Sequence, residues 1–110
     1  MRKTRVYIAK FKKGSEEFYK VGYTSLKNPY GRFIESCYSY DINIIFLSNY
    51  LTRKEAQLAE QKALQLIKHY QIKHTPKYPF VGYTECFCSG KDNLNRIINY
   101  VKCYDYSMRI

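Results

Sequence analysis

Two runs of aromatic and β-branched residues near the N-terminus constrain the fold of this chain most strongly. Residues 5–11 read RVYIAKF and residues 17–23 read EFYKVGY, with KKGS at 12–15 between them. Runs of this composition form strands, and a short connection that contains Gly and Ser reverses the chain. The sequence therefore predicts a β-hairpin at the start of the protein.

A third extended segment follows a loop that holds Asn28, Pro29 and Gly31. Residues 32–39 have the character of a short helix, and residues 41–48, DINIIFLS, are dense in Ile and Phe without helical spacing. A continuous apolar run is typical of a strand that is buried on both faces. We expect this third strand to be central in the sheet.

The clearest helix pattern covers residues 52 to about 72. It opens with TRKE at 52–55, in which the threonine can cap the helix and the glutamate can reach back to it. A proline-containing loop and an aromatic stretch at 80–88, which could be extended, lead to a final helix at 91–102. There, apolar residues recur at helical spacing.

The order β-β-α-β-α, followed by a loop and a C-terminal helix, predicts an α/β or α+β fold. In this fold a small, mainly antiparallel, three-stranded sheet is flanked by helices. The chain has 110 residues, which is a common size for one domain. We therefore expect residues 1–110 to form a single domain.

The chain is strongly basic, with 19 Lys and Arg against 9 Asp and Glu and a formal net charge of +10. The basic residues are spread along the sequence, so the folded chain would display them as a positive face. A polyanion with a phosphate backbone is the natural partner of such a face, and a protein that is merely basic is the alternative. No apolar run approaches the roughly 18 residues of a membrane span, so we expect no membrane partner.

The sequence has four cysteines without a CxxC pair, Cys37, Cys86, Cys88 and Cys103. Without a signal peptide they are expected to be reduced thiols of an intracellular protein that is not secreted. In a strand, Cys86 and Cys88 would point to one face and could hold a metal together with His69 or His74. Their spacing matches no common zinc module.

Glu60 stands out on the long helix because it falls among apolar residues. Its helical neighbours include Ala56, Ala63 and Ile67, so its carboxylate leaves the backbone towards the protein body. A buried carboxylate needs a cation, a hydrogen-bond network or a wet cleft. Glu60 is therefore either a salt-bridge partner or a metal ligand. The nearby alanines leave room for an ion, and they equally permit close packing of the helix on the sheet.

Several short motifs follow one another in a familiar order. Val6-Tyr7-Ile8 and Lys20-Val21-Gly22 lie on the two arms of the hairpin, Arg32 begins GRFIES, and Glu60 lies on the long helix. Together they resemble the GIY-YIG nuclease superfamily, with its two signature tripeptides, its arginine and its glutamate. GYTECF at 82–87 resembles a stretch in short phage and viral members of that family. The resemblance spans residues 5 to about 102 and implies a GIY-YIG-like domain.

This resemblance implies a metal-dependent DNA endonuclease with Tyr7, Lys20, Arg32 and Glu60 as catalytic residues. Tyr7 would accept the proton of the attacking water, Arg32 would bind phosphate oxygens, and Glu60 would hold Mg²⁺ or Mn²⁺. Lys20 replaces the second signature tyrosine and would position a water or neutralise a phosphate. The adjacent Tyr19 cannot take its place without a slip or a bulge, because neighbouring strand residues face opposite ways.

Further polar residues are secondary candidates. Tyr23 and Thr24 could bind phosphate or the catalytic groups, although packing at the edge of the turn explains them as well. His69 and His74 could contact phosphate or shuttle protons, and a histidine at a helix end also interacts with the helix dipole. Glu85 is either a second acid or, as we favour, a salt-bridge partner at the end of a loop.

Two other functions fit the same sequence. A non-catalytic nucleic-acid-binding module with this fold would tolerate Lys20 in place of tyrosine. A viral or phage accessory protein could instead dock a host protein through its basic face, in the cytoplasm or nucleus of the host cell. For the nuclease, duplex or branched DNA is the expected substrate. Strong sequence specificity would require a partner or a homodimer, because no further DNA-reading module is visible.

Overall fold

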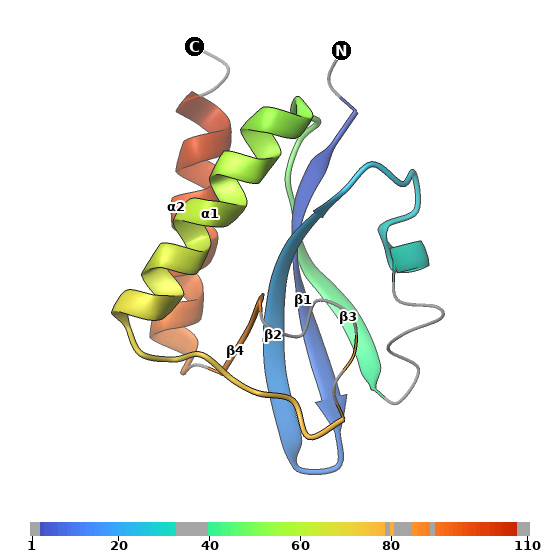
Figure 1. The fold of residues 1–110 in the computed structure, drawn as a ribbon, viewed down its shortest axis with the longest axis vertical. Helices are drawn as coiled ribbons and strands as arrows, with labels where there is room; N and C mark the ends of the chain where they lie inside the picture. The colour runs from blue at the N-terminus through green and yellow to red at the C-terminus, as the bar shows by residue number, and fades with distance from the viewer. Residues whose placement is uncertain (1–2, 33–39, 79, 81–84, 89, 108–110) are drawn as a thin grey trace.

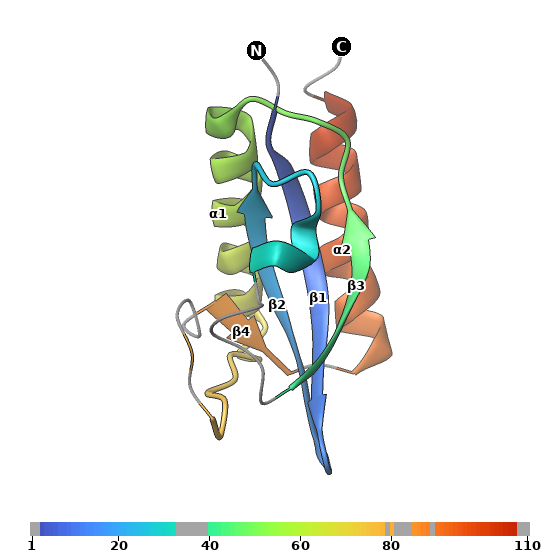
Figure 2. The ribbon, with the colours of Figure 1, turned by 90° about the vertical axis from the view of Figure 1, so that its right-hand side faces the viewer.

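A computed structural model describes residues 3–32, 40–78, 80, 85–88 and 90–107 of the chain. Two helices cover one face of an antiparallel sheet, and the 3-10 turn η1 (Pro29–Arg32) lies over the other face (Figure 1). Figure 2 shows this layering from the side of η1, with the sheet behind it and the helices at the back. The fold is α+β, as the sequence predicts.

The predicted hairpin forms the centre of the sheet. Its strands, β1 (Arg5–Lys13) and β2 (Glu16–Thr24), pair antiparallel along their whole length. Gly14 in the turn has a φ of 61°, in the left-handed region that glycine adopts without a steric penalty. The sequence prediction is therefore confirmed, with strands slightly longer than expected.

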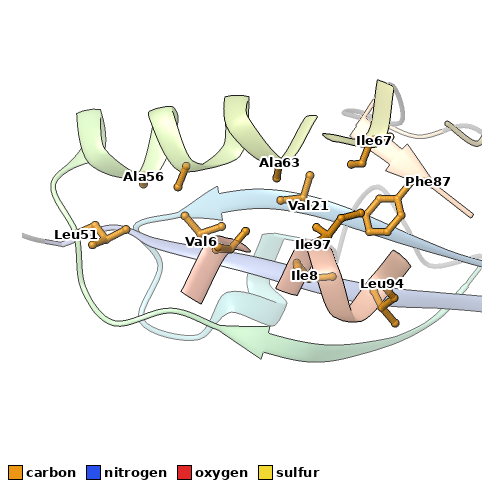
Figure 3. Close-up of a cluster of buried hydrophobic side chains, with 12 residues drawn as sticks. Val6, Ile8, Val21, Leu51, Ala56, Ala63, Ile67, Phe87, Leu94 and Ile97 are labelled. Atoms are coloured by element: carbon orange, nitrogen blue, oxygen red, sulfur yellow. The ribbon is translucent and has the colours of Figure 1, made fainter. Parts of the chain in front are cut away.

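The helix-covered face of the sheet carries the larger core, which joins α1 (Arg53–His69) and α2 (Lys91–Ser107) to the hairpin (Figure 3). Small side chains on α1 let this helix approach the sheet closely, so packing accounts for its alanines. The buried members of this core are Val6, Ile8, Val21, Leu51, Ala56, Ala59, Ala63, Ile67, Phe87, Leu94, Ile97 and Val101.

A second, largely aromatic cluster fills the other face of the sheet. The Phe11 ring stacks on Phe18 at 5.2 Å and on Phe80 at 5.1 Å between ring centroids. The members of this cluster are Tyr7, Ala9, Phe11, Phe18, Tyr40, Phe80 and Cys86. Since alternate strand residues face opposite ways, Tyr7 belongs to this face, whereas α1 packs on the opposite one.

The start of α1 follows the predicted capping box. Thr52 accepts a hydrogen bond from the backbone of Glu55, and the Glu55 side chain accepts one from the backbone of Thr52. The helix ends at His69, a few residues before the expected end, and α2 extends to Ser107, beyond the expected residue 102. Of the part of the chain that the structure describes, no helix is both long and apolar enough to cross a membrane.

The third strand, β3 (Asp41–Leu47), is an edge strand without a fully buried residue, so the expectation of a central strand that is buried on both faces is wrong. The sheet order is β3-β1-β2-β4, and β3 pairs only with β1. The pairing register shifts between Ile44 and Phe46, which leaves Ile45 unpaired and 36% exposed. This bulge moves Phe46 to the helix-covered face. As a result, apolar and polar residues do not alternate regularly along β3. Tyr30 Oη also accepts the N–H of Ile44 at 3.0 Å.

The sheet has four strands and not the expected three. The fourth, β4 (Cys86–Phe87), pairs antiparallel with Tyr19 and Lys20 of β2. Two residues are too few for a strand pattern to be visible in the sequence. The helix expected at residues 32–39 lies outside the described residues, apart from Arg32 at the end of η1.

Candidate active site

The hairpin register places Tyr7 and Lys20 side by side. Tyr7 pairs with Gly22 and Ala9 pairs with Lys20, so all four residues are oriented to the same face of the sheet. Lys20 Nζ donates a hydrogen bond of 2.9 Å to Tyr7 Oη and lies 5.2 Å from the centre of its ring. The two candidates that occupy the signature tyrosine positions of the hairpin, Tyr7 and Lys20, are therefore in direct polar contact.

Gly22 makes this contact possible. A β-carbon at position 22 would lie 2.5 Å from Tyr7 Oη and 3.0 Å from Lys20 Nζ. No side chain fits there while the phenol keeps its position, because real β-carbons do not approach other atoms so closely. Gly22 belongs to the Lys20-Val21-Gly22 motif, but its steric role was not predicted from the sequence. A glycine inside a strand often marks such a close approach, so the presence of Gly22 in a predicted strand could have indicated this role.

Glu85 completes the cluster from a distant part of the chain. Its Oε2 lies 3.1 Å from Lys20 Nζ, and its side chain is 30% exposed where that of Lys20 is 6% exposed. The pairing of Lys20 with Cys86 in β4 brings Glu85 to this position. The expected role of Glu85 as a salt-bridge partner is confirmed, and Lys20 is the partner.

The surroundings of Lys20 keep it charged. Burial lowers the pKa of a lysine, but the nearby oxygens of Tyr7 and Glu85 favour the ammonium form by more, so the pKa of Lys20 lies above its ordinary value. An ammonium group thus lies against a phenol in the interior of the protein. Few residues of a small domain hold a charge so far from solvent.

Arg32 and Glu60, the other two expected catalytic residues, come from different layers. The backbone of Arg32 ends η1, on the same side of the sheet as Tyr7 (Figure 2), and its side chain is outside what the structure describes. Glu60 is half-buried on α1, which packs on the opposite face through Ala56, Ala59 and Ala63. The structure therefore does not bring Glu60 to the face of the sheet that carries Tyr7, and the contribution of Arg32 to the site stays a prediction.

The secondary candidates near the hairpin are spread over both faces. Tyr19 packs against Phe87 on the helix-covered face, with 5.6 Å between ring centroids, so it points away from Tyr7 as expected. Burial raises its pKa. Tyr23 and Thr24 line a hollow of about 390 Å³ at the end of β2, together with Arg53 at the start of α1. Thr24 is buried, and its hydroxyl accepts the N–H of Leu26 at 3.1 Å.

The histidines and cysteines do not form a metal cluster in the described residues. His69 is exposed at the end of α1, with its ring 5.5 Å from that of Tyr70, and His74 Nε2 lies 2.9 Å from a carboxylate oxygen of Glu16. Cys86 is buried and Cys88 is exposed. Nowhere among the residues that the structure describes do three or more His, Cys, Asp or Glu gather around a possible metal position.

Comparison of the chain with protein-family models, with curated proteins and with solved structures found no match. The resemblance to the GIY-YIG superfamily therefore depends on the motif residues and on their arrangement. Of these residues, the structure brings Tyr7 and Lys20 into direct contact.

Proposed function

We propose that this chain is a metal-dependent DNA endonuclease of the GIY-YIG type, with Tyr7 and Lys20 at the centre of its active site. The observation that carries the proposal is the hydrogen bond of 2.9 Å from Lys20 Nζ to Tyr7 Oη. Removing an ammonium group from water is costly, and an apolar side chain would fill this face of the sheet at lower cost. A charged cluster kept inside an otherwise aromatic face favours a chemical role.

In the proposed reaction a water molecule attacks the phosphorus atom, and the bond to the 3′ oxygen breaks. Tyr7 would act in its phenolate form, whose negative charge the adjacent ammonium group of Lys20 offsets, and its Oη would accept the proton of the water. The 3′ oxygen that leaves would take a proton from solvent water. Glu85 holds Lys20 in place through the ion pair of 3.1 Å. Arg32 would bind the non-bridging oxygens of the phosphate.

Mg²⁺ or Mn²⁺ belongs to this proposal. Glu60 is its protein ligand by the resemblance alone, since α1 packs on the face of the sheet opposite Tyr7. The described residues provide no cage of several ligands, but Mg²⁺ keeps most of its waters and takes only one or two carboxylates from a protein. A half-buried carboxylate such as that of Glu60 fits this requirement. When bound, the ion would neutralise charge on the phosphate.

The burial of the two central residues favours a second function. Tyr7 and Lys20 expose only 1% and 4% of their surface. So little exposed surface restricts the access of a phosphate or a water, which must come within about 3 Å of these groups for proton transfer. The alternative is a nucleic-acid-binding module in which the Tyr7–Lys20–Glu85 cluster only holds the sheet together.

Cleavage of supercoiled plasmid distinguishes the two functions. A nuclease should give nicked or linear DNA only with Mg²⁺, and Tyr7→Phe, Lys20→Met, Arg32→Ala and Glu60→Ala should each lower the rate by about 100-fold or more. Tyr19→Phe, on the opposite face, is the matched control and should cut like the wild type.

Salt-sensitive DNA binding by the wild type and all variants, without cleavage, would favour the binding module. If the wild type does not bind DNA at physiological salt, both functions are excluded, and the docking of a host protein becomes the better proposal.

A further inference from the structure

One carboxylate fastens the loop after α1 to the end of the hairpin. Glu16, the first residue of β2, accepts hydrogen bonds from the backbone N–H of Lys77 at 2.9 Å and from the hydroxyl of Tyr40 at 2.8 Å. Its Oε2 also lies 2.9 Å from His74 Nε2. Burial acts to raise the pKa of Glu16, but these hydrogen bonds lower it by more, so its carboxylate stays ionised.

This attachment brings two lysines that are distant in the sequence onto one exposed ring. Lys13 Nζ lies 4.3 Å and Lys77 Nζ lies 5.9 Å from the centre of the Tyr78 ring, which is 41% exposed. Among the described residues, neither lysine takes part in an ion pair. The oxygens of Glu16 are engaged by its three partners. We call this surface the Lys13–Tyr78–Lys77 patch.

The patch lies on the same face of the sheet as Tyr7. Lys13 is six positions after Tyr7 in β1, so their side chains point the same way. The Tyr78 ring also lies 6.0 Å from Tyr40, a member of the aromatic cluster that includes Tyr7. At about 3.3 Å per strand residue, Lys13 is roughly 20 Å from Tyr7 along β1.

A distance of roughly 20 Å matches a definite length of DNA. Each strand of the duplex rises by about 3.4 Å per phosphate, so the patch lies about six base pairs from Tyr7. Lysines bind phosphates as compact charges, and such contacts position a duplex without reading its sequence. The hairpin thus joins the candidate active site to a cationic surface at a spacing that one duplex can bridge.

We propose that the Lys13–Tyr78–Lys77 patch binds the phosphate backbone of the DNA about six base pairs from the bond that is cleaved. This inference rests on the proposed endonuclease function, because the position of the cut defines the distance. The patch would hold a duplex along the hairpin, so the substrate must extend from the active site to the hairpin turn.

The salt dependence of binding tests the patch apart from cleavage. Affinity for a fluorescein-labelled duplex of about 30 base pairs is measured by anisotropy, with EDTA present, at several salt concentrations. Each phosphate contact contributes about 0.9 to the slope of log K against log salt, so Lys13→Gln/Lys77→Gln should reduce the slope by about 1.8. The control is Lys54→Gln/Lys62→Gln, which removes the same charge from exposed positions on α1 and should leave the slope unchanged.

A position-specific measurement completes the test. Uncharged methylphosphonates placed about six base pairs from the mapped nick should weaken binding of the wild type and not of the patch variant. An unchanged slope in the patch variant, or an equal decrease in the control, would overturn the proposal. Both double variants should keep the thermal midpoint of the wild type. If the slope falls as expected and no protein cuts plasmid, the patch binds phosphate and only the endonuclease proposal fails.

Discussion

Gly22 lies opposite Tyr7 across the β1–β2 pair, and a β-carbon on residue 22 would come within 2.5 Å of the Tyr7 hydroxyl oxygen. The glycine therefore has a steric role in this protein, separate from any flexibility of the chain. It leaves the space into which the phenol of Tyr7 extends and in which Lys20 reaches it.

Gly22→Ala should displace the Tyr7 phenol and destabilise the fold. Inserting a methyl group into a packed site typically costs about 1–3 kcal/mol, which urea unfolding can measure. Gly90→Ala is the comparison, because a β-carbon there meets nothing within 4 Å. It should cost less than Gly22→Ala, since it only weakens the N-cap of α2. Equal effects of the two substitutions would show that Gly22 has no special steric role.

Lys20→Met should lose a pH-dependent contribution to stability. The pKa of Lys20 is raised above 10.5 in the folded protein, so its contacts with Tyr7 and Glu85 stabilise the fold fully below pH 10.5. The contribution is lost as the pH rises through the folded-state pKa. The unfolding free energy of the wild type minus that of Lys20→Met should therefore be constant around neutral pH and decrease above pH 10.5. A difference that grows in alkali would contradict the assignment.

Glu16→Gln should destabilise the attachment of the loop to the hairpin. Leaving the buried hydroxyl of Tyr40 poorly paired costs about 1–3 kcal/mol at neutral pH. The pKa of Glu16 is depressed below 4.5, so its contribution is present above pH 4.5 and is lost as the pH falls through the folded-state value. Glu17→Gln, which removes an exposed ion pair with Lys10, should have a smaller effect. Urea midpoints across the acid range provide the measurement.

Thr52→Ala should weaken the start of α1. The threonine caps the backbone of Glu55, and loss of such a cap costs about 1 kcal/mol of unfolding free energy. Gln57→Ala, at an exposed position of the same helix, should leave stability nearly unchanged. If both substitutions behave alike in urea, the capping box contributes nothing measurable.

The elements with local signals could be predicted from the sequence. The hairpin has two β-rich runs and a glycine in its turn, and α1 has a complete capping box, so neighbouring residues decide both structures. The position of β3 could not be predicted, because the bulge at Ile45 makes an edge strand look like a buried one. The two-residue strand β4 exists only through its pairing with β2.

The candidate site likewise has a part that could be predicted from the sequence and a part that could not. The sequence predicts the hairpin, and the contact between Tyr7 and Lys20 follows from the register that the hairpin adopts. The ion pair of Lys20 with Glu85 joins positions 65 residues apart, and nothing local determines it. The packing of α1 on the face opposite Tyr7 could not be predicted either. The periodicity of a helix identifies its buried side and not the surface that this side covers.

The bulge in β3 and the hydroxyl of Tyr30 both oppose aggregation of the protein through the β3 edge of the sheet. An open sheet edge offers a row of donors and acceptors to which a strand of another molecule can add. Here the outward N–H of Ile44 is already occupied by Tyr30, and the irregularity at Ile45 interrupts the straight path that an incoming strand would need. This side of the sheet is thus a poor template for aggregation, although it ends in an apolar strand.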